Sequence, residues 1–253
     1  MSKLKRSALH AAWWMLSPTL LLLLPQALYV KRTTLRLPEA QPLDRQNAPA
    51  PAPAPTHLWH LGESTVAGVG VAHLSQGLSA QLAQALSEQG RTAVSWQSLG
   101  VNGIRLSRLI DKVMAAPAPK AQLIVVTMGV NDTTGFTSVR TWQRQLRQLV
   151  HLLQRHNPNT PVVFTQVPPM MKFPALPAPL KFVIGLRAQL LDAYLQKVCE
   201  QEGTTGSVHY VKAEPDFSPQ LMAEDGYHPS ALGYQTWAQA LTPKISELMT
   251  RND

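Results

Sequence analysis

The sequence has a single cysteine, Cys199, among its 253 residues, and this shortage excludes several classes of protein. One cysteine cannot form an intramolecular disulfide, and it cannot build a cysteine-rich zinc or iron–sulfur site. Cys199 follows an apolar stretch with helical periodicity, Leu190–Val198, so we expect it to be a buried structural thiol. Glycine-rich phosphate loops are also missing, and the spacing of the histidines does not indicate a metal site.

Charged residues are few, at 15% of the chain, yet their balance is basic, with a net charge of +8. Much of the excess flanks an apolar run near the N-terminus, which favours lipid head groups over DNA as the partner. A second group of arginines recurs at helical spacing between Arg140 and Arg155, which is typical of a solvated helix face. No nucleic-acid motif accompanies these residues, and we expect no binding of nucleic acid.

The apolar run, Ala8–Val30, has no charge apart from a possible one on His10. At about 1.5 Å per residue, a helix of this length could cross a hydrocarbon core of about 30 Å. Pro18 and Pro25 predict a kink. We therefore expect residues 1–36 to be a membrane anchor, with the rest of the chain on the periplasmic or extracytoplasmic side; a cleaved signal peptide is the alternative.

A spacer follows the anchor. Residues 46–56 read QNAPAPAPAPT, and alternating alanine and proline favours an extended chain over a helix or a paired strand. We expect a proline- and alanine-rich linker over residues 37–56 and one folded domain over residues 57–253.

From His57 onwards, strand patterns alternate with helix patterns. The predicted strands are His57–Leu61, Thr92–Ser98, Ala121–Met128, Thr160–Val167 and Ser207–Val211. The predicted helices are Gln76–Gln89 with Gly90 as its C-cap, Ile104–Ala115, Ser138–His156, Leu180–Glu202 and Pro229–Met249. This alternation predicts an α/β fold, with a parallel sheet covered by helices on both faces.

Polar residues follow the predicted strands at the edge where such sheets form their sites. Ser64 comes after the first strand, Gly103 after the second and Asn131 after the third. Asp225 and His228 stand just before the last helix. We therefore expect positions far apart in the sequence to converge at one rim.

These residue types suit nucleophilic catalysis on an ester. A serine hydroxyl needs a base, and His228 can supply one near neutral pH. Asp225 can accept a hydrogen bond from the other ring nitrogen and so orient the imidazole. The backbone N–H groups of Ser64 and Gly103, with the Asn131 amide, can donate to the oxyanion. Each motif alone has a plainer interpretation as a cap or turn; their order and placement together favour the catalytic one.

The ordered segments resemble the sequence blocks of SGNH/GDSL hydrolases, a superfamily of serine esterases and lipases. The matching motifs are G-E-S at Ser64, N-G at Gly103, G-V-N-D at Asn131 and D-G-x-H-P at His228. The resemblance implies a flavodoxin-like, three-layer α/β/α sandwich with a mainly five-stranded sheet. It also implies Ser64 as nucleophile and oxyanion donor, Gly103 and Asn131 as oxyanion donors, and Asp225 and His228 as the rest of the triad.

The first motif departs from the usual G-D-S of that superfamily, because Glu63 replaces the aspartate. The residue is outside the triad, so the change bears on the geometry of the turn, where a longer acid can reach a different partner. Gly103 is preferred to Gly100 as the oxyanion donor because of its spacing before Ile104 and Arg105.

The segment Val167–Gly185 follows the fourth strand at the same rim and is rich in proline and apolar residues. Such a loop can form an acyl pocket or a lid, or it can simply pack on the core. In the first case Met170, Met171 and Phe173 are the candidate substrate-binding residues. The substrate would then be a small-molecule or lipid acyl ester, such as a lysophospholipid.

The sequence thus predicts a membrane-tethered serine ester hydrolase that works through an acyl-enzyme on Ser64. The triad mechanism needs no metal, and we expect no cofactor. Two alternatives share the site: an acyltransferase or carbohydrate O-deacetylase with the same triad, and a non-catalytic binding module on a membrane stalk.

Overall fold

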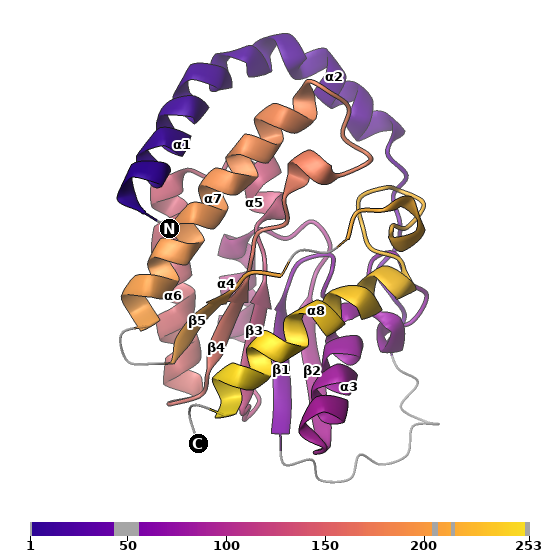
Figure 1. Ribbon diagram of the computed structural model, residues 1–253, viewed down its shortest axis with the longest axis vertical. Helices are drawn as coiled ribbons and strands as arrows, with labels where there is room; N and C mark the ends of the chain where they lie inside the picture. Colours follow the sequence, from indigo (N-terminus) through magenta and orange to yellow (C-terminus); the bar gives the residue numbers. More distant parts are fainter. Residues whose placement is uncertain (1, 43–55, 204–206, 214–215, 251–253) are drawn as a thin grey trace.

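Five parallel strands form the centre of the molecule in the computed structural model, which describes residues 2–42, 56–203, 207–213 and 216–250 (Figure 1). The strands are β1 (Thr56–Gly62), β2 (Val94–Gly100), β3 (Leu123–Thr127), β4 (Val162–Thr165) and β5 (Val208–Val211). Their order is β2-β1-β3-β4-β5, the flavodoxin-like order. The predicted fold class is confirmed.

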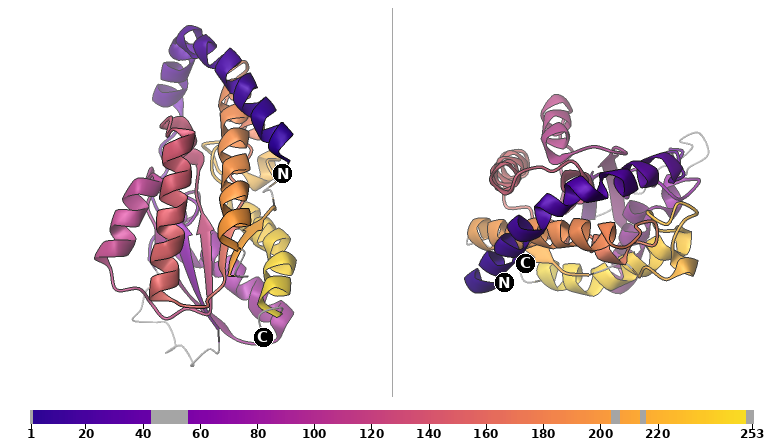
Figure 2. Two further views of the ribbon diagram at one scale, coloured as in Figure 1. Left: turned by 90° about the vertical axis from the view of Figure 1, so that its left-hand side faces the viewer. Right: turned by 90° about the horizontal axis from the view of Figure 1, so that it is seen from above.

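Helices cover both faces of the sheet (Figures 1 and 2). On one face lie α4 (Leu106–Ala115), α6 (Val139–His156) and α7 (Leu180–Glu202), and on the other lie α3 (Leu78–Gly90) and α8 (Ala231–Thr250). A hydrophobic core lies on each face of the sheet, and successive residues of β3 point into opposite cores: Ile124 packs on the first face and Val125 on the second. Every residue of β3 is buried, as its continuous apolar run predicts.

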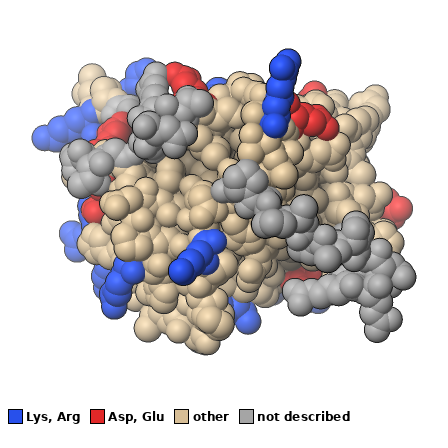
Figure 3. Space-filling model, turned by 90° about the horizontal axis from the view of Figure 1, so that it is seen from below, with Lys and Arg blue, Asp and Glu red and all other residues tan. Residues whose placement is uncertain are grey.

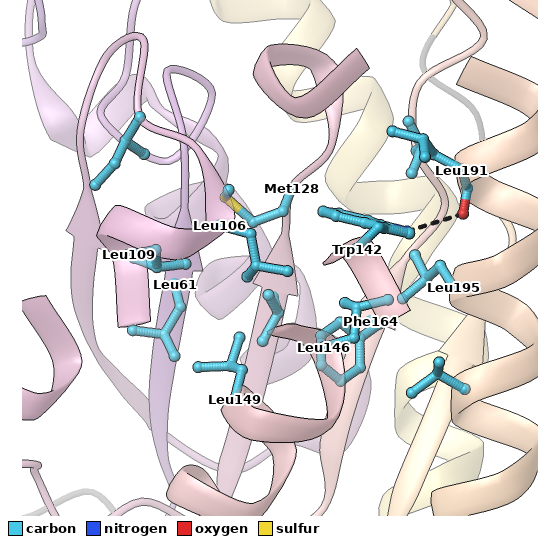
Figure 4. Packing of buried hydrophobic residues seen from close by; sticks show 14 of the residues in the cluster. Leu61, Leu106, Leu109, Met128, Trp142, Leu146, Leu149, Phe164, Leu191 and Leu195 are labelled. Carbon is cyan, nitrogen blue, oxygen red and sulfur yellow. Dashed lines mark hydrogen bonds between the residues drawn. The ribbon is translucent and has the colours of Figure 1, made fainter. Parts of the chain in front are cut away.

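Large side chains fill the core between β3, α6 and α7 (Figure 4). Trp142 of α6 is fully buried, and its indole N–H donates to the carbonyl of Leu191 in α7 at 3.0 Å. Burying the ring without that partner would cost free energy, so the bond fixes how the two helices meet. Cys199 is buried on the same side, as predicted, and burial raises the pKa of its thiol.

Two local features differ from the sequence prediction. Gly90 is the last residue of α3, and Arg91 is the C-cap in a left-handed conformation (φ 51°), because its N–H still reaches the carbonyl of Ser87. A short helix, α5 (Val130–Thr134), follows β3 where the sequence indicated only a turn.

The N-terminal segment forms two helices, α1 (Lys3–Leu16) and α2 (Leu20–Thr33), with the predicted break at Ser17–Thr19, where Pro18 lies. They arch along α7 and over the carboxyl ends of the strands (Figures 1 and 2). Lys3–Thr33 is the one helical stretch, among the described residues, that is long and apolar enough to cross a membrane. Most of the predicted linker, residues 43–55, lies outside the described residues.

Candidate active site

Ser64 lies in a tight turn two residues after β1 ends at Gly62. The turn needs glycine at position 62, because a Cβ there would meet the carbonyl oxygen of Thr127 at 2.3 Å. The serine is only 7% exposed, and it lines a cavity of about 30 Å³ that His228 also lines, here called the small cavity. The first and last sequence motifs therefore meet at one point.

Asp225 holds the imidazole of His228. The Nδ1 atom of His228 lies 2.6 Å from Oδ2 of Asp225, and Oδ1 accepts the backbone N–H groups of Tyr227 and His228 at 2.9 and 3.0 Å. Burial raises the pKa of Asp225, but the bonds from His228 and Tyr227 outweigh it and leave the pKa below its usual value. The carboxylate stays ionised, and Nε2 is the ring nitrogen left to take a proton from a hydroxyl.

Three N–H groups are the candidate donors to an oxyanion at Ser64. In the described part of the chain, neither the Ser64 nor the Gly103 backbone N–H has a hydrogen-bond acceptor. Gly103 has φ 75°, and a Cβ there would meet nothing within 4 Å. Gly100 instead lies inside β2, where a Cβ would meet Ala67 N at 2.3 Å, so its glycine serves packing. The Gly103 N–H is therefore open to an acceptor, and its role as oxyanion donor stays a prediction.

Glu63 orients the third donor, the amide of Asn131. Its carboxylate accepts the backbone N–H groups of Val130 and Asn131 at 2.8 and 3.0 Å, and Nδ2 of Asn131 at 2.6 Å. The same oxygens thus cap α5, which starts after a glycine without a capping side chain. An amide nitrogen has two hydrogens, so one remains for a substrate oxygen. Sequence reasoning noted Glu63 but missed this function.

Complete burial raises the pKa of Glu63 to about 7, against the lowering effect of these three hydrogen bonds. The nearby Asp132 caps α4, since its Oδ2 accepts the N–H of Leu106, the first residue of that helix, at 2.9 Å. Two buried carboxylates therefore connect the ends of β1, β3 and β2, from which the candidate donors come.

The predicted substrate-binding residues divide in the structure. Phe173 lines the small cavity and packs edge-to-face against Tyr227 at 5.4 Å. Met170 is fully buried in the core, and Met171 packs against Gly185 with its sulfur 3.5 Å from Nε2 of Gln189. Of the three, only Phe173 lines either of the cavities at His228.

A second cavity of about 780 Å³, here called the large cavity, adjoins the small one at Tyr227 and His228. Leucines and other apolar residues of α2 form much of its wall. The sequence signal of α2 was interpreted as that of a membrane helix, so its position beside the site was missed.

The remaining histidines agree with ordinary structural roles where the structure describes them. His60 is fully buried between the hydroxyls of Thr127 and Ser79, at 3.0 and 2.9 Å. Burial lowers its pKa to about 3, so the ring is neutral. No group of three or more His, Cys, Asp or Glu side chains that could hold a metal occurs among the described residues.

The α/β fold and the order of the motifs along its sheet rim fit an ester-hydrolysing enzyme. The model of the GDSL-like Lipase/Acylhydrolase family matches residues 60–236, which is more than half of the chain. The protein belongs to this family. No curated protein matches the sequence significantly.

Solved structures similar to this chain have the same fold. A lipase/acylhydrolase from Enterococcus faecalis is 17% identical, with a TM-score of 0.56 over 76% of this chain and 96% of that one. The salicylyl-acyltransferase SsfX3 from a tetracycline biosynthetic pathway is 22% identical, with a TM-score of 0.57 over 76% of this chain and 55% of that one. A family two carbohydrate esterase from Cellvibrio japonicus is 17% identical, with a TM-score of 0.58 over 81% of this chain and 65% of that one.

Proposed function

We propose that the protein hydrolyses carboxylic esters of lipid-like acyl chains through an acyl-enzyme on Ser64. The observation that carries the proposal is the small cavity that Ser64 shares with His228, whose Nδ1 is held 2.6 Å from the Asp225 carboxylate. A nucleophile and a base on one cavity, with the base oriented by a buried acid, are what acyl transfer requires.

In the proposed mechanism, Oγ of Ser64 attacks the ester carbonyl while Nε2 of His228 takes the hydroxyl proton. The charge on the carbonyl oxygen is stabilised by the N–H groups of Ser64 and Gly103 and by the Asn131 amide. His228 returns the proton to the leaving alcohol as the C–O bond breaks. Water, activated by the same imidazole, then releases the acid and restores Ser64.

The walls near His228 are mostly apolar, with a few polar residues such as Lys31, Arg36 and Asn102, and this favours an acyl-ester substrate over a carbohydrate acetate, whose sugar would leave the leucines in contact with hydroxyl groups. We also infer membrane association through the N-terminal helices. Trp14, Met15 and Leu22 are all more than 60% exposed on these helices, although they are apolar. The basic residues that follow, Lys31 and Arg32, suit an anionic lipid surface.

The test is hydrolysis of a soluble butyrate ester by the full chain in detergent, beside Ser64→Ala. We expect turnover by the parent protein and a loss of at least about 10⁴-fold in kcat in the variant. Equal rates in the two folded proteins would contradict the assignment of Ser64.

A further inference from the structure

The helix α2, which lies outside residues 60–236 matched by the family model, has a face that forms a wall of the large cavity. We propose that this face is part of the substrate site and selects esters with long acyl chains, so that the N-terminal segment determines specificity as well as location. This inference rests on the proposed function of Ser64. It differs from the prediction made from the sequence, which placed the acyl pocket at Met170, Met171 and Phe173.

The large cavity borders part of the candidate catalytic machinery, and Ser64 itself lines only the small cavity beside it. His228 and Asp225 line it directly, and so does Asn102, the residue before Gly103. Thr134, which lies in α5 with Asn131, lines it as well. Because the two cavities meet at Tyr227 and His228, an acyl chain on Ser64 can pass from the small cavity into the large one beneath α2.

The chemistry of the wall matches a hydrocarbon chain. The contributing residues of α2 recur at helical spacing and are apolar apart from Lys31, and α7 with the segment before it supplies apolar residues opposite; they are Leu20, Leu21, Leu23, Leu24, Ala27, Val30 and Lys31, with Leu176, Leu180 and Ile184. At about 30 Å³ per methylene, similar to a water molecule's share of volume, a chain of about 16 carbons needs about 480 Å³. The cavity of about 780 Å³ can contain it.

Polar contacts hold α2 at a defined position. Gln26 is an amide in the apolar part of α2, and it donates to the carbonyl of Ala178 at 2.8 Å and accepts the N–H of Leu180 at 3.1 Å. It therefore satisfies a backbone donor at the start of α7. Beyond α2, the carboxylate of Glu39 accepts the N–H of Asn102 at 2.6 Å. The contacts of Gln26 thus join α2 to the start of α7. The contact of Glu39 joins the segment after α2 to the loop that carries Gly103.

Further contacts fix α1 along the same neighbour. His10 lies 3.2 Å from the hydroxyl of Tyr194, and Arg6 lies 3.6 Å from the carboxylate of Glu200. Trp13 is buried beneath the guanidinium of Arg187, at 4.7 Å. The helix pair thus packs on the catalytic domain along α7, which is what a wall of the substrate site needs.

The first test compares acyl chain lengths, from acetate to palmitate with one leaving group, in mixed micelles. Ala27→Phe places a ring in the cavity, whereas Leu22→Phe adds one to a residue of α2 that is 82% exposed and outside the lining. We expect Ala27→Phe to lower kcat/KM at least tenfold for chains of 12 or more carbons and less than twofold for acetate, because each buried methylene is worth about fourfold in binding. Leu22→Phe should preserve the profile. An unchanged ratio of long- to short-chain activity in folded Ala27→Phe overturns the inference.

A second test does not depend on a bulky substitution. Ala27→Cys and Leu22→Cys each add one accessible thiol, since the native Cys199 is buried. Modifying Ser64 with a hexadecyl fluorophosphonate should slow maleimide labelling of Ala27→Cys at least fivefold, whereas an ethyl analogue should not. Labelling of Leu22→Cys should be unaffected by either. Equal labelling after complete modification overturns the role of α2, whereas failure to modify Ser64 at all contradicts the proposed function itself.

Discussion

Glu63 connects the turn of the candidate nucleophile with the residue proposed to stabilise the oxyanion. Its carboxylate accepts three N–H groups of Val130 and Asn131, and Glu63 is 2% exposed. Water cannot easily reach these donors, so losing the carboxylate would leave buried N–H groups without an acceptor and would cost free energy. An aspartate, the usual residue of the G-D-S motif, has one methylene less and would reach less far. The departure in sequence thus has a structural consequence.

Replacing Glu63 by glutamine should impair catalysis more than folding. The NH2 group of the glutamine would face N–H donors of Val130 and Asn131 that the carboxylate now accepts, and the Asn131 amide would lose its fixed orientation. We therefore expect kcat for a short ester to fall about 10- to 100-fold with little change in KM. Glu63→Asp, which keeps two acceptor oxygens, should lose less. Steady-state kinetics beside thermal unfolding make the test, and a lower melting temperature with unchanged kcat would show a purely structural role.

The raised pKa of Glu63 also predicts how stability depends on pH. The pKa rises from 4.5 in the unfolded chain to about 7 in the folded protein, so folding favours the protonated form. This contribution to stability is complete below about pH 4.5 and is lost as the pH rises through about 7. The stability of the parent protein relative to Glu63→Gln should therefore decrease between pH 5 and 8. Denaturant unfolding measures it, and parallel pH profiles for the two proteins would contradict the shift.

Members of the proposed triad should differ in their effects. Asp225 orients His228 and does not itself transfer the proton, so Asp225→Asn should lower kcat by about 10⁴-fold, whereas Ser64→Ala and His228→Ala should lower it by about 10⁶-fold. The measurement is kcat for one soluble ester under identical conditions. Equal losses in all three variants would refute this division of roles.

At the scale of the elements, alternating periodicities were enough to predict every strand and most helices of the catalytic domain. They fail at α5, whose five residues, Val130–Thr134, are too few to show a helical period. That helix depends on a cap from Glu63, a residue 67 positions away from Val130 in the sequence. A contact of this kind leaves no local pattern, which is why the tasks of Glu63 and Asp132 could not be predicted.

The turn before α5 depends on Gly129, which has φ 130°; a Cβ there would meet the side chain of Val167 at 2.7 Å. Gly129→Ala should therefore destabilise the protein by about 2–4 kcal/mol, through both backbone strain and overpacking. Gly90→Ala is the matched control, because an added Cβ at the end of α3 meets nothing within 4 Å. Its effect should be neutral or stabilising by less than about 1 kcal/mol. Comparable destabilisation in both variants would disprove the local explanation.

At the scale of the whole molecule, an apolar helix near the N-terminus gives the same sequence signal whether lipid or protein surrounds it. The sequence therefore predicted an anchor and a tether, and it could not reveal that α1 and α2 pack along α7. On the face seen from below, the described Lys and Arg side chains are scattered, with Asp and Glu among them, and do not form one basic surface (Figure 3).

The outward side of the N-terminal helices gives a prediction at this scale. Met15 and Leu22 are 74% and 82% exposed and lie outside the lining of the large cavity. The double variant Met15→Glu with Leu22→Glu should reduce co-sedimentation with anionic vesicles at least fivefold and leave turnover of a soluble ester unchanged, since a charge in the apolar layer costs about 2.5–3.5 kcal/mol. Met114→Glu, at an exposed apolar position of α4, is the control. Full vesicle binding by the double variant would contradict association through this side.

The central claim is that Ser64 is an activated nucleophile, and intact-mass labelling of the full chain with a fluorophosphonate probe tests it most directly. Oγ of Ser64 would displace fluoride from the phosphorus of the probe, which adds one phosphonyl group to the protein. With Ser64→Ala and His228→Ala as controls, and with detergent or lipid present, the account predicts one adduct on the parent protein, none on the first variant and far slower labelling of the second. A folded parent protein that stays unmodified, or an adduct that persists in Ser64→Ala, would contradict it.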